Sequence, residues 1–180
     1  RISQKANYIG EKMKKIMKKL VILLITIMMT FNSYATVNDD TSVEEYSELL
    51  PKNIKSDTAT EQSVRRGEFF ARADLVITDE GNGNIGAFAV AYMDHAVDEV
   101  YITIYLDQWN EEEERWQQVA YYDAEFYAED YPEGLTDPTV DITFLDQERE
   151  HYYRLRSVFS AVYDNDYEGF SPTTSGIWIE

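Results

Sequence analysis

Hydrophobic and polar residues alternate along Glu99–Trp109, where the chain reads EVYITIYLDQW. Successive side chains of an extended strand point to opposite faces, so this alternation predicts a strand with one buried face. The residues expected on the buried face are Val100, Ile102, Ile104 and Leu106. This is the strongest structural signal in the sequence, and the segments that could pack on it are also strand-like.

Six more segments after residue 68 have the strand pattern and are separated by turn residues. They are residues 69–78, 85–92, 116–127, 140–144, 151–162 and 177–179. In 116–127 the expected inner face is Trp116, Ala120, Tyr122, Ala124 and Phe126, and in 151–162 it is Tyr153, Leu155, Ser157 and Phe159. The connections are a turn at 79–84 and loops at 110–115, 129–138 and 164–172. The pattern therefore predicts an all-β sandwich of about seven antiparallel strands over residues 67–180.

The segment before residue 36 differs from the rest of the chain. A lysine-rich stretch, Met13–Lys19, leads into an apolar run, Leu20–Phe31, and then Asn32–Ala35, in which Ser33 and Ala35 are the small residues expected at positions −3 and −1 of a cleavage site. This three-part pattern predicts a signal peptide, helical in its apolar part, at 13–35 with cleavage after Ala35. The apolar run is too short to span a bilayer, which needs about 20 residues, although an uncleaved anchor is the alternative. We therefore expect a secreted, extracellular protein with no stable membrane anchor.

Two further segments flank the predicted signal peptide. Residues 1–12 are expected to be upstream translation, because Gly10-Glu11 can be encoded by a ribosome-binding sequence just before Met13. Residues 36–66 are polar and are expected to form a flexible leader. Within the leader, Ser42 and Glu45 have the capping-box spacing, which predicts a short helix near 43–50 that stops at Pro51.

The charge balance narrows the classes of partner. The first 35 positions hold seven of the 16 basic residues and one of the 34 acidic residues, which leaves 9 basic and 33 acidic residues and a net charge of −24. Such a charge repels nucleic acid phosphates and anionic membranes, whereas it favours cationic partners and calcium. The chain has no cysteine, so its stability depends on packing without disulfides.

Two resemblances rest on residues of the predicted strands. The placement of Trp109, Trp116 and the late Tyr-Tyr-Arg-Leu-Arg strand is similar to that of a fibronectin type III module, and the number of strands matches the size of an immunoglobulin-like sandwich. The motifs of the second resemblance are Ile85-Gly86, Ala91-Tyr92, Val97-Asp98-Glu99-Val100, Ile104-Tyr105-Leu106, Trp109, Trp116, Tyr152–Arg156 and Thr174–Ile177. With these motifs, Arg72–Ile179 resembles a family of small secreted Gram-positive proteins classed as a domain of unknown function. That resemblance implies secretion but no activity, and the acidity of this chain departs from the family's Ser-, Thr- and Gly-rich texture.

The sequence contains no recognisable catalytic constellation. His95 and His151 have no Ser or Cys nucleophile at a familiar spacing and are expected to be solvated or structural. We therefore expect a protein that is not an enzyme and needs no cofactor. The alternative is a secreted hydrolase that gathers carboxylates from the loops 111–114 and 129–141 into a cleft. A structural envelope or matrix protein is a third class.

One acidic turn has features of a calcium site. Asp164, Asp166 and Glu168 place carboxylates at alternate positions, and calcium prefers several oxygen ligands. The segment lacks the full twelve-residue loop pattern with its terminal glutamate. If calcium binds, we expect these three residues to hold it; a solvated acidic turn is the alternative.

The face of Glu99–Trp109 opposite the core carries aromatic rings beside polar groups. Tyr101, Tyr105 and Trp109 are the candidate ligand-binding residues, because stacking and directed hydrogen bonds are how such surfaces hold sugars and peptides. Ordinary cross-strand pairing of aromatic residues is the alternative. Arg154 and Arg156 are expected either to bind the ligand or to pair with acids. The sequence thus predicts a non-catalytic, monomeric module that binds an extracellular glycan or protein.

Overall fold

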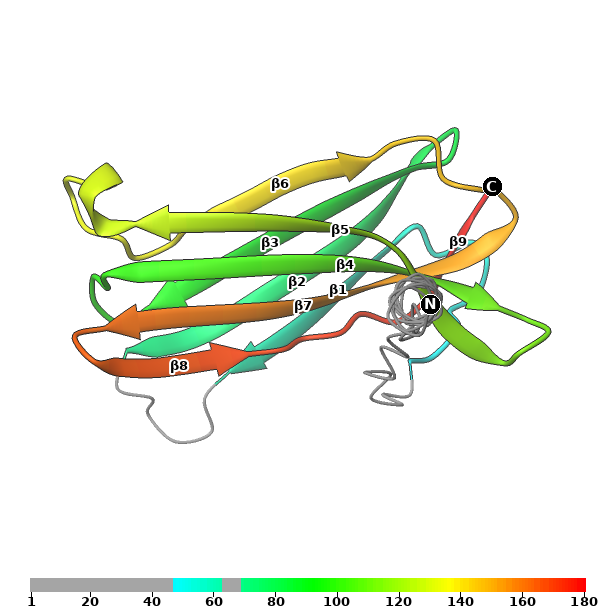
Figure 1. The fold of residues 1–180 in the computed structure, drawn as a ribbon. Helices are drawn as coiled ribbons and strands as arrows, with labels where there is room; N and C mark the ends of the chain where they lie inside the picture. Colours follow the sequence, from blue (N-terminus) through cyan, green and yellow to red (C-terminus); the bar gives the residue numbers. More distant parts are fainter. Residues whose placement is uncertain (1–46, 63–68) are drawn as a thin grey trace, which may run out of the picture. The chain divides into compact units, whose positions relative to one another are not determined.

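The computed structural model describes residues 47–62 and 69–180 (Figure 1). In these ranges it contains strands and one short 3₁₀ helix, η1 (Ala128–Asp130). The strands are β1 (Ser56–Gln62), β2 (Phe70–Gly81), β3 (Asn84–Met93), β4 (Glu99–Asn110), β5 (Arg115–Tyr127), β6 (Thr139–Phe144), β7 (His151–Tyr163), β8 (Asp166–Phe170) and β9 (Ile177–Ile179). No helix in this part of the chain has the length and hydrophobicity needed to cross a membrane. The predicted segments 1–12 and 13–35 lie outside the described residues.

The strands form two antiparallel sheets, which confirms the predicted β-sandwich. Sheet 1 has the order β1-β2-β3-β6, and sheet 2 has the order β5-β4-β7-β8 with β9 also paired to β7. Antiparallel pairs join every neighbour in both sheets. The chain crosses between the sheets after β3, β5 and β6, so that residues far apart in sequence meet on one sheet.

The core lies between the inner faces of the two sheets. The four predicted inward residues of β4 are fully buried, as are Tyr153, Leu155 and Phe159 of β7. From sheet 1 they meet Leu75, Ile77 and the small side chains Ala87, Ala89 and Ala91. The two-residue periodicity therefore located the buried faces of these central strands correctly.

The structure corrects the prediction for two strands. Residues 56–62, predicted as part of the leader, form β1 in register with Gln62↔Arg72 through Ser56↔Thr78 of β2. The predicted final loop contains β8, which pairs with the end of β7. Both strands lie at sheet edges and are mostly polar, because an edge strand gains its backbone hydrogen bonds without burying a hydrophobic face. Strand pattern alone therefore missed them.

The helix predicted near 43–50 is wrong for the residues that can be checked. Residues 47–50 are not helical, and Leu49 forms an isolated parallel bridge with Gly176. The Leu50 N–H donates to the Gly176 carbonyl over 2.9 Å, so that tertiary pairing replaces helix hydrogen bonds in this segment. Residues 43–46 lie outside the described residues.

A β-bulge in β5 changes the predicted direction of Trp116. Leu106 pairs with Ala120, but the next residue, Asp107, pairs with Gln118, so Val119 is the extra residue. Such an insertion reverses the alternation of side chains on either side of it. Trp116 therefore shares the outer face of sheet 2 with its partner Trp109, whereas Ala120, Ala124 and Phe126 pack against the core as predicted.

Candidate functional site

The outer face of sheet 2 collects six aromatic side chains from β4 and β5. Tyr121 is 62% exposed and Tyr127 is 36% exposed, and the other four are partly exposed. We call this set the aromatic face: Tyr101, Tyr105, Trp109, Trp116, Tyr121 and Tyr127. The structure thus brings the three predicted ligand-binding residues onto one face and adds three rings from the neighbouring strand.

Two cross-strand ring pairs occur within the aromatic face. Trp109 and Trp116 meet edge to face with ring centroids 5.3 Å apart, and Tyr101 and Tyr127 do so at 6.2 Å. Such pairs stabilise a sheet by about 0.5–1.5 kcal/mol each. Part of the predicted ligand surface therefore also contributes to stability through cross-strand pairing.

Carboxylates fix the two tyrosines at one end of the aromatic face. The Tyr101 hydroxyl donates to Glu99 Oε2, and the Tyr127 hydroxyl donates to Glu125 Oε2 over 2.6 Å. The hydrogen bond to Glu99 raises the pKa of Tyr101, and the bond to Glu125 raises the pKa of Tyr127. The neutral hydroxyls act as hydrogen-bond donors here, and the carboxylates keep further lone pairs that can accept hydrogen bonds.

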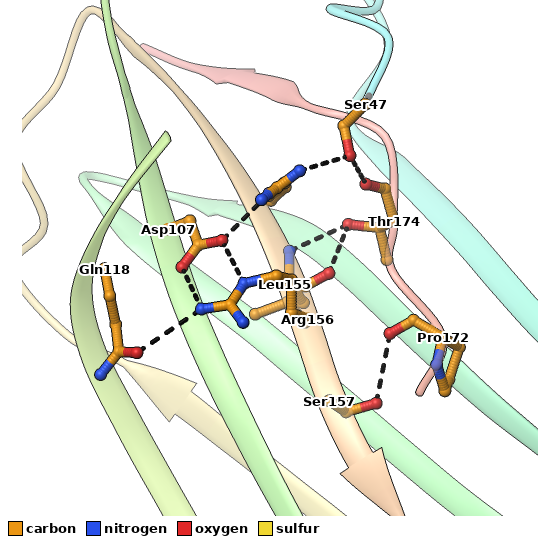
Figure 2. Close-up of polar contacts among 9 residues, drawn as sticks. Ser47, Asp107, Gln118, Leu155, Arg156, Ser157, Pro172 and Thr174 are labelled. Atoms are coloured by element: carbon orange, nitrogen blue, oxygen red, sulfur yellow. Dashed lines mark hydrogen bonds and ion pairs between the residues drawn. The ribbon is translucent and has the colours of Figure 1, made fainter. Parts of the chain in front are cut away.

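At the other end of β4, Asp107 holds two arginines of β7. Asp107 Oδ2 accepts from Arg154 Nε over 3.0 Å and from Arg156 Nε over 2.6 Å, while Oδ1 accepts from Arg156 Nη2 over 3.1 Å. Figure 2 shows Asp107 with Gln118 on one side and Arg156 on the other. Of the two alternatives for the arginines, their pairing with an acid is the one that the structure contains.

Residues before β1 join this network. Arg154 Nη1 donates to Ser47 Oγ over 2.9 Å. That hydroxyl donates to the Thr174 carbonyl over 3.0 Å (Figure 2). Leu49 lies close to Trp116 as well, since a Cβ on Gly176 would be 3.0 Å from Leu49 and 2.7 Å from the Trp116 ring. The segment thus covers the Trp116 end of the aromatic face and leaves the tyrosine end exposed.

The two arginines also contact the aromatic face directly. The Arg154 guanidinium lies over the Trp116 ring at 4.7 Å, and that of Arg156 lies over the Tyr105 ring at 4.9 Å. Cation–π contacts of this kind hold an aromatic ring in a fixed orientation. The network around Asp107 therefore sets the positions of Tyr105 and Trp116.

The three predicted calcium ligands are not gathered into one group. Glu168 Oε2 accepts from the backbone N–H groups of Phe69 and Phe70 over 3.3 and 2.7 Å. Asp164 lies in the β7–β8 turn and Asp166 begins β8, and both are exposed. In residues 47–62 and 69–180, no three His or acidic side chains are close enough together to hold a metal ion.

The histidines and the loop acids have separate surroundings. His95 packs edge to face on Tyr163 with centroids 4.6 Å apart, and His151 Nε2 lies 3.7 Å from Glu148 Oε2. The hydrolase alternative requires acids of 111–114 and 129–141 in one cleft. A groove of about 460 Å³ between β5 and β6 is lined by Asp141 from the second range and by no residue of the first.

No model of a known family and no curated protein matches this chain. The resemblance to secreted Gram-positive proteins therefore stays a prediction.

Sequence reasoning missed half of the aromatic face and all of the groove. The sequence places Tyr121 and Tyr127 in a predicted strand, but the pairing of β5 with β4 is needed to place them beside Tyr101 and Tyr105. The groove depends on β5 and β6 being the edges of different sheets, and no local pattern carries that information. Tyrosines at even spacings on two consecutive strands, Tyr101 with Tyr105 and Tyr121 with Tyr127, are the signal that could have extended the predicted face.

Proposed function

We propose that this protein is a non-catalytic binding module that acts outside the cell and recognises its ligand through the tyrosine end of the aromatic face. The observation that carries the proposal is the exposure of Tyr121 and Tyr127 beside Tyr101 and Tyr105 on the outside of a sheet. Outward-facing positions of a sandwich are usually polar, because the core is built from the inward-facing ones. An exposed tyrosine surface on a strand scaffold supports a recognition role.

The chemistry of this face favours a glycan of uncharged sugars. Aromatic rings stack on the apolar faces of sugar rings, and Glu99 and Glu125 offer acceptors for sugar hydroxyls. The acidity of the chain disfavours polyanionic glycans and nucleic acids. The rings lie on the open outside of a sheet and not in an enclosed pocket, which suits an extended polymer better than a small enclosed molecule.

The proposed place of action and fold subtype rest on further observations. The predicted signal peptide at 13–35 supports secretion. Without the edge strand β1, sheet 1 has three strands, β2, β3 and β6. In sheet 2, β8 and β9 both pair with β7 and together count as one strand, so this sheet has four. That count supports the immunoglobulin- or fibronectin type III-like subtype.

Sedimentation with insoluble polysaccharides and Gram-positive cell walls tests the proposal. Purified protein should sediment with one of these polymers, and the Tyr105→Ala/Tyr121→Ala double variant should lose most of that sedimentation. The matched control is Phe88→Ala, because Phe88 is a 38% exposed aromatic residue on β3 of the other sheet. Equal loss in the control, or sedimentation that survives in the double variant, overturns the assignment to the aromatic face. Failure of every polymer to sediment the wild type, followed by binding to a soluble protein, replaces the glycan with a protein ligand.

A further inference from the structure

The sandwich has two long edges that differ in how they are closed. At one edge, β1 of sheet 1 lies beside the segment that follows β8 of sheet 2. Glu61 Oε2 accepts from the Ser171 N–H and Asp57 Oδ2 accepts from the Ser175 N–H, each over 2.7 Å. Carboxylates of one sheet thus satisfy backbone donors at the edge of the other, which blocks that edge to another strand.

The opposite edge has no such closure within the described residues. β5 and β6 are the terminal strands of their sheets and lie side by side, as Figure 1 shows. Both line the groove of about 460 Å³. The backbone edge of β5, a strand of 13 residues, is therefore available for pairing.

The walls of this groove differ in chemistry between floor and rim. Tyr122 and Phe126 of β5 face inward, since their partners in β4 are the buried Ile104 and Val100. Val140 and Ile142 of β6 pair with the buried Ala89 and Ala87 and also face inward. The rims are acidic, with Asp123 and Glu125 on β5 and Asp141 on β6, all exposed.

We propose that the edge of β5 binds a cationic peptide as an added antiparallel or parallel strand. Side chains of an added strand alternate, so that every second one enters the apolar groove and the others lie beside Asp123 and Glu125. The matching ligand alternates apolar and basic residues. One residue of an added strand occupies about 160 Å³, which is the product of the strand rise, the spacing between strands and the spacing between sheets. The groove therefore holds about three residues of an extended chain.

Charge selects this occupant over a second copy of the chain. Pairing two β5 edges would bring Asp123 and Glu125 of one copy close to the same acids of the other. Like charges across adjacent strands are destabilising, and both molecules carry a large negative charge. A cationic strand makes favourable contacts at the same positions. Glu125 borders both surfaces, but this inference concerns the backbone edge of β5 and the groove, does not use the tyrosine rings, and does not depend on the glycan proposal.

Fluorescence anisotropy with a labelled short peptide of alternating lysine and valine tests the proposal. We expect saturable binding to the wild type, with an affinity about tenfold lower for the Asp123→Lys/Asp141→Lys double variant. The matched control is Glu111→Lys/Glu112→Lys, which makes the same change in net charge in an exposed turn. It should lower the affinity only slightly, through long-range attraction. All four acids are exposed, so both double variants are expected to fold, and circular dichroism checks this.

Two additional arms separate strand addition from general charge attraction. Two peptides are N-methylated at alternate residues, one at the odd and the other at the even positions, so that each lacks half of its backbone donors. Because only every second N–H of an added strand points toward β5, one of these peptides should lose about tenfold in affinity. The Tyr105→Ala/Tyr121→Ala variant should keep the peptide affinity, which distinguishes this site from the aromatic face. Absence of binding to the wild type, equal loss in the two charge variants, or indifference to both N-methylation registers overturns the proposal.

Discussion

Asp107 and Arg154 lie opposite each other on β4 and β7 and form an ion pair on the outer face of sheet 2 with almost no exposure to solvent. Arg154 Nε is 3.0 Å from Asp107 Oδ2, and the two side chains are 4% and 2% exposed. An outward-facing position of a sheet normally reaches water. Here the neighbouring Trp116 ring and Ser47 exclude it, so the pair behaves as a buried one.

Removal of the Asp107 carboxylate should therefore destabilise the fold strongly. Asp107→Ala leaves the guanidinium of Arg154 buried without this carboxylate, which costs about 3–5 kcal/mol when one partner of a buried pair is lost. Urea unfolding followed by tryptophan fluorescence measures the change. The exposed Glu112→Ala serves as control and should stay within about 0.5 kcal/mol of the wild type. Similar values for the two variants would contradict the burial of the pair.

The β2–β3 hairpin offers a test that compares two glycines. Gly81 and Gly83 have positive φ angles of 83° and 78°, but a Cβ on Gly83 would lie 2.4 Å from the Gln147 backbone oxygen, whereas one on Gly81 would meet nothing within 4 Å. Both alanine variants incur the left-handed strain of about 1–2 kcal/mol. Gly83→Ala should lower the free energy of unfolding by at least about 1 kcal/mol more than Gly81→Ala, because the loop backbone at Gln147 must also move. Thermal unfolding of both variants gives the difference, and equal losses would show that the 146–150 loop yields freely.

The central strands could be predicted because each buries one face completely. Ile102 and Ile104 alternate with Tyr101, Thr103 and Tyr105, and only an extended chain places such residues on two faces. The turn predicted at 79–84 is equally well marked by glycine and asparagine, and the positive φ angles at 81–83 confirm that the chain reverses there, although β2 extends to Gly81 and β3 begins at Asn84, so that the turn is shorter than predicted. Local chemistry was sufficient in both cases.

The remaining features depend on pairing between distant residues. β1 is a polar segment that becomes a strand because β2 offers a free edge, and the reversal at Val119 depends on how β5 aligns with β4. Residues 47–50 could follow a helical pattern locally but pair with Gly176 instead. The sequence of β4 was enough to predict half of the aromatic face. The groove could not be predicted, because strand order decides which edges meet.

A calcium titration separates the two roles open to Glu168. Its carboxylate accepts two backbone N–H bonds from Phe69 and Phe70, and bonds to a charged acceptor contribute about 1.5–3 kcal/mol. Glu168→Ala should lower the free energy of unfolding by about this amount in calcium and in chelator alike. Asp166→Ala, at an exposed position, should have little effect. The predicted calcium site would be supported instead if chelation lowered the stability of the wild type and Asp166→Ala abolished the response to calcium.

Tyr153 gives the fold a defined response to alkaline pH. Its ring is buried, and its hydroxyl accepts from Gln108 Nε2 and donates to the Glu148 carbonyl, each over 2.8 Å. Burial raises the pKa of Tyr153 from 10.0 to about 12. The neutral hydroxyl is therefore favoured in the folded state, and its contribution to stability is complete below pH 10.

Stability should fall as the pH rises from 10 toward 12, because the unfolded chain releases this proton first and the folded chain keeps it. A shift of this size contributes at most about 2–3 kcal/mol. Other tyrosines titrate in the same range, so the informative quantity is the difference between wild type and Tyr153→Phe in urea unfolding at several pH values. The phenylalanine variant should be less stable at pH 8, since two hydrogen bonds are lost, and the gap should narrow as the pH rises. If the difference in free energy of unfolding stays constant across this range, the pKa of Tyr153 is not raised by folding.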